Sequence, residues 1–204
     1  MPRSRWCGGG VTVRAVTGAM SGEPGRWRTF GSREIYQSPE LWLGQVDVQL
    51  PDGERVWEPV VRLHQAALMA LVDDQRRVLM VWRHRFVPDL WGWELPGGLV
   101  DEDEEPADAA LREVEDTTGY RAGGVEHLIT FRPLPETVDC EHVAFVGRDP
   151  ERVGEAVGAG NVARVEWVPF GAVPGLIAAG EIWHGGTLVA LLPLLTGGAP
   201  AVSA

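Results

Sequence analysis

The pattern of hydrophobic and polar positions predicts a strand-rich beginning followed by a buried sheet. Between residues 26 and 62, short apolar and polar units alternate around the turn Pro51-Asp52-Gly53, which is typical of antiparallel hairpins. Two near-continuous apolar runs follow at 66–72 and 78–82, separated by the turn-forming residues 73–75. The pattern therefore predicts an N-terminal antiparallel layer of about three strands, and then two buried central strands.

One short helix is expected over residues 106–119. Its initial proline suits a first helical position, the acids at 102–105 suit the positive end of the helix dipole, and its final glycine suits a left-handed closing residue. Glu113 and Thr117 lie one helical turn apart, with Asp116 beside them, so one flank offers oxygen ligands. Such ligands suit Mg²⁺, whose other positions are filled by water and substrate phosphate. The alternative is that the acidic helix is only a solvated face.

The rest of the chain predicts further strands and two more helices, with no internal repeat and no linker to a second domain. We expect a flexible arm over 1–25 and a single domain over 26–204, whose first part, 26–62, is the strand extension. The later elements are two strands joined by an acidic loop at 133–141, a strand at 164–170, a short helix at 173–179 and a terminal helix at 186–195.

Composition and charge limit the classes of partner that we expect the protein to bind. The 204 residues are 45% hydrophobic and can bury one substantial core. The formal net charge of −11 argues against a nucleic-acid polymer, although bound cations would let a small anionic substrate approach. Cys7 and Cys140 show neither disulfide nor zinc spacing, which favours a reducing cytoplasm. We expect no membrane partner, because no apolar run reaches the roughly 18 residues of a span, and Arg14 interrupts the one candidate signal core, which also leaves Met20 open as a true start.

The segment from Gly97 to Tyr120, GGLVDEDEEPADAALREVEDTTGY, resembles the signature of the Nudix hydrolases. That signature runs from a glycine to a glutamate, an Arg-Glu pair, an aliphatic residue, a Glu-Glu pair and a final glycine. The Glu-Glu positions here hold Asp116 and Thr117, so one carboxylate is shortened and the other is absent. The positions that match are Gly98, Glu104, Arg112, Glu113, Val114 and Gly119.

This resemblance implies a Nudix-type α/β/α sandwich of the α/β (α+β) class with a mixed sheet. The phrase WGWELPGG resembles the ADP-ribose pyrophosphatase branch, in which a front extension serves dimerisation, so a homodimer is implied. The implied activity is hydrolysis, dependent on Mg²⁺ or Mn²⁺, of a nucleoside diphosphate linked to another group, such as ADP-ribose or a nucleotide sugar. Because Thr117 removes a carboxylate, the alternative is a weakened nucleotide-binding or sensing module.

The resemblance also implies roles for individual residues. A metal would be held by the carbonyl of Gly97 and by acids of the loop and helix, Glu113 would be a ligand or the base, and Arg112 would pair with an acid. Glu94 would help to hold the substrate, and an extra carboxylate, Glu141 or Asp139, would serve as base or ligand. The implied metal shell is Gly97, Glu104, Glu113 and Asp116.

Two arginines, Arg83 and Arg85, are placed by the pattern alone at the exit of the second buried strand. Arginines at a strand end can clamp a phosphate in a bidentate manner, or they can pair with the protein's own acids. The sequence leaves both possibilities open. His142 alternates with its strand and is interpreted as structural.

Overall fold

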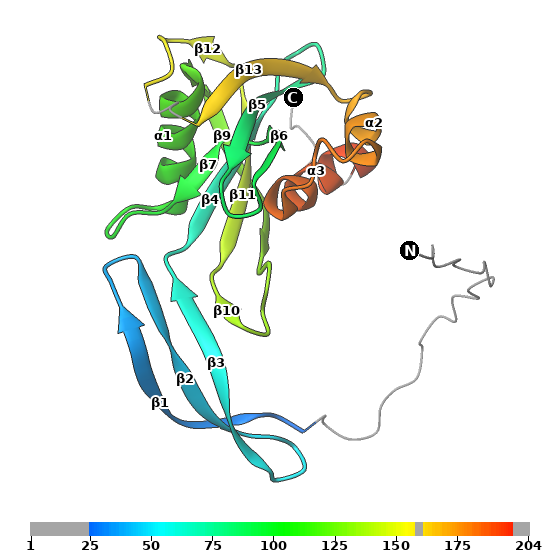
Figure 1. Cartoon of the computed structure of the whole chain (residues 1–204). Helices are drawn as coiled ribbons and strands as arrows, with labels where there is room; N and C mark the ends of the chain where they lie inside the picture. The colour runs from blue at the N-terminus through cyan, green and yellow to red at the C-terminus, as the bar shows by residue number, and fades with distance from the viewer. Residues whose placement is uncertain (1–24, 158–160, 198–204) are drawn as a thin grey trace, which may run out of the picture.

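An antiparallel sheet leads the fold and projects away from the rest of the molecule (Figure 1). The computed structural model describes residues 25–157 and 161–197, so the arm expected at 1–25 lies almost wholly outside the described residues. The predicted three-stranded layer is confirmed: it consists of β1 (Arg28–Gln37), β2 (Leu41–Gln49) and β3 (Arg55–Leu63). A two-residue strand, β10 (Val138–Asp139), adds parallel to β3. It was not predicted, because two residues carry no periodicity.

The central sheet is mixed, as expected. Its order is β7-β4-β11-β9, with β4 parallel to β11 and the outer pairs antiparallel. Its strands are β4 (Ala66–Leu71), β7 (Gly97–Leu99), β9 (Gly124–Phe131) and β11 (His142–Arg148). A second, antiparallel sheet has the order β13-β5-β6. Its strands are β5 (Arg77–Arg85), β6 (Leu90–Glu94) and β13 (Val162–Pro169), and a small ribbon joins β8 (Tyr120–Arg121) to β12 (Glu151–Arg152).

Helices cover both sides of these strands, which confirms the α/β/α arrangement (Figure 1). The first, α1 (Pro106–Thr118), lies on one side, while α2 (Val173–Ala178) and α3 (Gly185–Thr196) lie on the other. The predicted terminal helix was one residue short at each end. None of the helices that the structure describes is long and apolar enough to cross a membrane.

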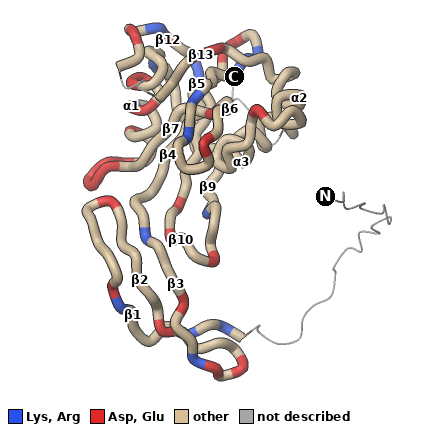
Figure 2. Tube along the Cα trace, viewed as in Figure 1, with Lys and Arg blue, Asp and Glu red and all other residues tan. Residues whose placement is uncertain are grey.

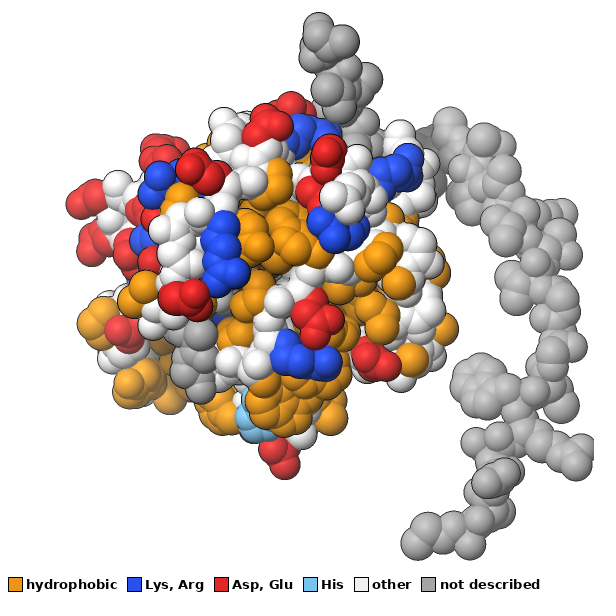
Figure 3. Space-filling model, turned by 90° about the horizontal axis from the view of Figure 1, so that it is seen from above, with side chains coloured by type: hydrophobic (Ala, Val, Ile, Leu, Met, Phe, Trp, Pro, Cys, Tyr) orange, Lys and Arg blue, Asp and Glu red, His pale blue; other side chains and the backbone are white. Residues whose placement is uncertain are grey.

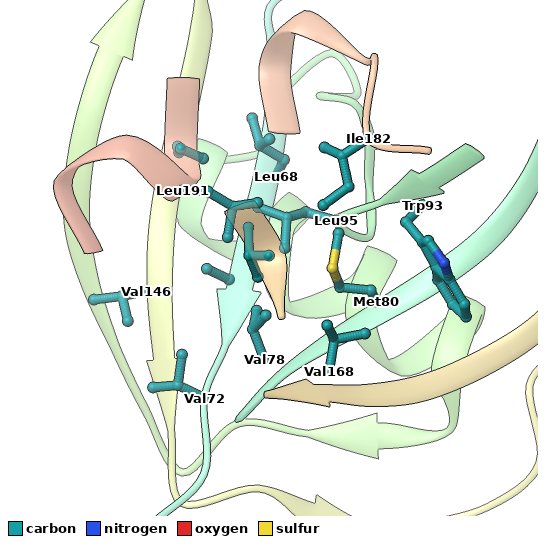
Figure 4. Packing of buried hydrophobic residues seen from close by; sticks show 14 residues of the cluster. Leu68, Val72, Val78, Met80, Trp93, Leu95, Val146, Val168, Ile182 and Leu191 are labelled. Atoms are coloured by element: carbon teal, nitrogen blue, oxygen red, sulfur yellow. The ribbon is translucent and has the colours of Figure 1, made fainter. Parts of the chain in front are cut away.

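The apolar runs were predicted correctly because both of their faces are buried. Along β4, Met69 packs into the core beneath α1, whereas its neighbour Leu68 packs into the core beneath α3. Figure 4 shows the second core, a cluster that includes Leu191 of α3 and Met80 of β5. A fully buried side chain of this size contributes about 1.5–3 kcal/mol relative to an exposed one, so both faces of the sheet stabilise the position of α1 and α3.

The ends of α1 fix the position of the acidic loop. Pro106 occupies the first turn, and Gly119 closes the helix with φ 73° while its N–H donates to the carbonyl of Glu115. A Cβ at Gly119 would lie 2.3 Å from the carbonyl oxygen of Gly154, so glycine is required there for space as well as for conformation. The loop that enters the helix is a run of acids between β7 and α1 (Figure 2).

Candidate active site

One arginine joins the acidic loop to α1. The Nε of Arg112 donates to Glu104 Oε1 at 2.8 Å, and its Nη2 donates to Glu104 Oε2 at 2.9 Å. The Nη1 donates to Glu113 Oε1 at 2.9 Å, and Nη2 also reaches the carbonyl of Leu99 at 3.3 Å. A single guanidinium therefore holds together the loop, the helix and β7, and the expected pairing of Arg112 with an acid is present.

Glu104 is occupied by this network rather than free. The hydrogen bonds from Arg112 lower the pKa of the Glu104 carboxyl to about 2 and raise the pKa of Arg112. The backbone N–H of Asp101 donates to Glu104 Oε2 at 3.1 Å, which closes the loop on itself. A metal ion would have to compete with Arg112 for both oxygens of Glu104. The main effect of Glu104 is therefore to position the loop and Arg112.

The pKa of Glu104 gives a testable dependence of stability on pH. Because the folded-state pKa lies below the ordinary value of 4.5, the carboxylate stabilises the fold above about pH 4.5, and this contribution is lost as the pH falls towards about 2. We expect Glu104→Gln to flatten the profile of unfolding free energy in that window. Urea denaturation at several pH values measures it. Glu102→Gln, at an exposed position of the same loop, is the matched control, and an equal flattening there would contradict the assignment.

Glu113 presents one free oxygen beside β7. A Cβ at Gly98 would lie 2.5 Å from Glu113 Oε1, so the carboxylate occupies the space that any larger residue would need. The side chain of Glu113 is 21% exposed. Its Oε1 accepts from Arg112, whereas its Oε2 accepts no hydrogen bond from the residues that the structure describes. Glu113 is therefore a carboxylate fixed on one side and available to a cation on the other.

The two departures from the signature face different surroundings. Thr117 is only 3% exposed, while Asp116 is exposed to solvent. Within residues 25–157 and 161–197, no group of three or more His, Cys, Asp or Glu side chains is arranged to hold a metal. The donor set, essentially Glu113 with the nearby carbonyl of Gly97, fits a divalent cation that takes most of its ligands from substrate phosphate and water.

Arg85 and Arg83 have different partners. Arg85 binds Glu94 through Nε, at 3.0 and 3.1 Å to its two oxygens, and through Nη2 at 2.6 Å. Glu94 is completely buried, so this pair is the acid–arginine alternative that the sequence left open. Both arginines lie within β5 rather than beyond its end, because β5 pairs with β6 as far as Arg85 and Leu90.

Arg83 is buried without a comparable partner. Its side chain makes no ion pair with the described residues, and its Nε is buried without a hydrogen bond. Burial and the charge of Arg85 lower the pKa of Arg83, while Glu94 and Glu113 act in the opposite direction. A buried guanidinium without a partner is costly, and an anionic ligand near Glu113 would satisfy it.

A pocket of about 240 Å³ opens beside the two glycines of β7. Cys140 is buried there, and burial together with Asp139 raises the pKa of its thiol. The thiol donates to the carbonyl of His64 at 3.2 Å, so Cys140 is a packing residue rather than a nucleophile. The residues that line this pocket are Leu63, Ala66, Ala67, Leu68, Arg85, Leu95, Gly97, Gly98, Leu99, Cys140, His142 and His184.

The two loop acids differ in where the sheet places them. Glu141 accepts from Gln65 Nε2 at 2.7 Å and from Arg132 at 2.8 Å. The carbonyl of Gln65 in turn accepts from Val100 at the end of β7, so Glu141 lies close to the acidic loop. Asp139 is exposed on β10 and belongs to the projecting extension. Glu141 is thus the better placed of the two candidates.

His184 was not among the predicted site residues. This residue lines the pocket together with Arg85, and burial lowers the pKa of its imidazole. A histidine directly before Gly185, at the start of a predicted helix, was the available signal, since other residue types are preferred at that position. His142, interpreted as structural, also lines the pocket and has a pKa lowered by burial.

Comparison with known proteins identifies the family of the chain. The NUDIX domain family matches residues 62–190. A CMP-5'-(N-acetyl-N-hydroxy-3-aminopropyl)phosphonate hydrolase from Streptomyces rubellomurinus is 41% identical over 170 residues, which cover 83% of this chain and 82% of the relative. An ADP-ribose pyrophosphatase from Bacillus subtilis is 30% identical over 112 residues, covering 55% and 60% respectively.

A solved structure supports the fold. The crystal structure of an ADP compounds hydrolase superposes with a TM-score of 0.76 at 16% sequence identity and covers 87% of this chain and 98% of that protein. At this identity the likeness concerns the fold alone. Together with the family match and the hydrolase relatives, it confirms the expected family: the chain is an enzyme of the Nudix hydrolase family.

Proposed function

We propose that the protein hydrolyses the P–O–P bond of a nucleoside 5'-phosphate joined to a second phosphorus group. ADP-ribose carries this unit within its diphosphate, and a CMP-phosphonate carries it between a phosphate and a phosphonate. This unit is what the compounds in the names of the relatives from Bacillus subtilis and Streptomyces rubellomurinus have in common. The observation that carries the proposal is the Glu113 carboxylate, which is fixed by Arg112 against Gly98 with one oxygen left free.

In the proposed reaction, water attacks one phosphorus atom and the bridging oxygen leaves with the other phosphorus atom. The two products each carry a single phosphate or phosphonate group. Glu113 would hold a divalent cation, and Arg112 keeps the Glu113 carboxylate oriented. Arg83, whose buried Nε has no hydrogen-bond partner among the described residues, would offer positive charge to the anionic oxygens of the substrate. Glu141 or Asp139 would accept a proton from water. Glu141 is favoured because its partner Gln65 also binds Val100 at the end of β7.

Mg²⁺ or Mn²⁺ is the proposed cofactor. When bound, such a cation neutralises negative charge on the phosphate oxygens and lowers the pKa of a coordinated water. The residues proposed to hold it are Glu113 and the carbonyl of Gly97, with Asp116 and Glu104 at the periphery. Since Thr117 contributes only a hydroxyl, we expect metal affinity to be weak in the absence of substrate.

A hydrolysis panel tests the proposal. ADP-ribose, nucleotide sugars with each common base, and CMP esters of simple phosphonates would be incubated with Mg²⁺ or Mn²⁺, and products would be identified by mass spectrometry. We expect at least one of these substrates to be cleaved into two products that each carry a single phosphate or phosphonate group. Binding without turnover across the panel would favour a binding or sensing module instead.

Thr117→Glu tests the missing carboxylate. A glutamate here, one helical turn after Glu113, would offer a second anionic ligand and is expected to strengthen Mn²⁺ binding by about tenfold or more. Isothermal titration calorimetry measures it. Thr118→Glu is the matched control, because the Thr118 hydroxyl points back to the carbonyl of Val114 at 2.6 Å. Equal affinities for the wild type and for Thr117→Glu would place the metal elsewhere.

We also propose a homodimer formed through the projecting sheet, and a cytoplasmic location, which the small cysteine content supports. Every residue of β1 is exposed, and large apolar side chains gather on this sheet and its approach. Light scattering coupled to size exclusion is expected to show a dimer. The exposed large apolar residues on this sheet and its approach are Trp27, Phe30, Ile35, Tyr36, Trp57 and Leu63.

A further inference from the structure

His184 occupies the N-cap position of α3, with φ −67° and ψ 120°. Its side chain accepts a hydrogen bond from the backbone N–H of Thr187, with 3.3 Å between the amide nitrogen and Nδ1. Asn, Asp, Ser and Thr are the residues that usually cap helices, because their short side chains reach the free N–H groups readily. Capping alone therefore gives no reason for an imidazole here.

A second hydrogen bond fixes which ring nitrogen carries the proton. The Thr187 Oγ1 accepts from the backbone N–H of Leu95 at 3.1 Å and lies 3.2 Å from His184 Nδ1. Since the Leu95 amide can only donate, the Thr187 hydroxyl proton is free to point at Nδ1. Nδ1 thus faces two donors, and the neutral ring carries its proton on Nε2. Thr187 is fully buried, so this anchor is rigid.

The ring of His184 borders the pocket beside β7. His184 lines that pocket with Arg85, Gly97 and Gly98, and Nε2 makes no hydrogen bond with any residue in the described part of the chain. A Cβ on Gly186 would lie 3.0 Å from His184 Cε1, so the backbone packs closely beside the ring. The ring is therefore fixed through Nδ1, and its Nε2 has no hydrogen-bond partner among the described residues.

Two other observations favour an anionic ligand in front of this donor. Arg85, which shares the pocket, is likewise held from behind, by the buried Glu94. Burial and the charges of Arg85 and Arg83 lower the pKa of His184, against the opposing effect of Glu94. His142 and the Cys140 thiol are titratable groups that line the same pocket. The lowered pKa favours the neutral imidazole, whose proton the contacts of Nδ1 assign to Nε2.

We propose that His184 is a substrate-binding residue whose Nε2–H donates to a non-bridging anionic oxygen of the substrate's P–O–P unit. This inference rests on the proposed function. A donor fixed before the ligand arrives loses little freedom on binding, which is the arrangement expected of a group that positions the substrate.

Binding of a non-hydrolysable ligand tests the proposal independently of turnover. The α,β-methylene diphosphates of adenosine and cytidine would be titrated with Mg²⁺ into wild-type protein and into His184→Asn. Asparagine keeps an acceptor near the position of Nδ1, and so keeps the cap, but it lacks the Nε2–H. We expect the melting temperature to stay within about 2 °C and the Kd to rise about tenfold or more, the effect of one lost hydrogen bond to a charged group.

His184→Gln is the converse variant. Its longer amide reaches the region of Nε2 but no longer caps α3, so we expect it to retain part of the affinity while its melting temperature falls by about 2–4 °C. Nitrogen-15 spectra of the wild-type imidazole should show the Nε2–H tautomer, with its proton signal shifting on addition of the analogue.

The outcomes separate this inference from the proposed function. If wild-type protein hydrolyses P–O–P substrates and His184→Asn binds both analogues as tightly as wild type, the inference alone is wrong and His184 is only a cap. An Nδ1–H tautomer would also overturn it. If wild-type protein neither binds the analogues nor hydrolyses any substrate, the proposed function fails and this inference fails with it.

Discussion

Glu113→Gln is expected to lower kcat for P–O–P hydrolysis by about 10²- to 10³-fold while leaving the fold intact. The substitution removes the negative charge that the site offers to a cation. Without the cation, the negative charge that develops in the transition state is no longer stabilised. The side chain keeps its length and can still accept from Arg112. Steady-state kinetics at saturating Mg²⁺, together with thermal unfolding, measure both properties.

Glu115→Gln is the matched control for this prediction. It is the same change on the same helix, but Glu115 pairs with Arg121 at the exposed side, at 2.8 Å. We expect kcat to remain within about twofold of wild type, since exposed ion pairs contribute little. Equal losses of kcat in the two variants would mean that α1 carries no specific catalytic carboxylate.

Arg85→Ala is expected to lower the free energy of unfolding by about 3 kcal/mol, because it leaves the fully buried Glu94 without its bidentate partner. Chemical denaturation measures this. The control is Arg121→Ala, whose partner Glu115 is 39% exposed, and there we expect a loss below about 1 kcal/mol. Comparable losses in the two variants would contradict the structural role assigned to the buried pair.

The buried pair also shows how the two arginines divide their tasks. Arg85 is satisfied by Glu94, while Arg83, one strand period earlier on the same face, has a buried Nε without a partner. Of these two arginines, only Arg85 has an acidic partner among the described residues. Figure 3 shows that elsewhere the charges are mixed: acidic and basic side chains alternate with apolar ones on the face seen from above.

Much of the fold could be predicted because local signals and tertiary packing agree. Pro106 and Gly119 marked the ends of α1 through their backbone preferences, and the runs that became β4 and β5 were apolar on both faces because helices cover both sides. The two-residue strand β10 could not be predicted, since its existence depends on β3 lying alongside it.

The site was less predictable, because its details depend on contacts between distant residues. Helical spacing placed Asp116 and Thr117 on one flank, but only packing shows that the threonine is buried and the aspartate exposed. The sequence could not decide between the two roles of the arginines, since the acid that satisfies Arg85 comes from another strand. His184 gains its meaning from Thr187 and Leu95, and no local pattern reveals that connection.

We propose that the cation and the P–O–P unit meet between Glu113 and the glycines of β7. Paramagnetic broadening of backbone amide signals by Mn²⁺, in the presence of an α,β-methylene nucleoside diphosphate, tests this most directly. We predict that broadening centres on Gly97, Gly98 and Glu113 and is largely lost in Glu113→Gln. Broadening centred on the exposed acids at 101–103, and unchanged in Glu113→Gln, would contradict the account.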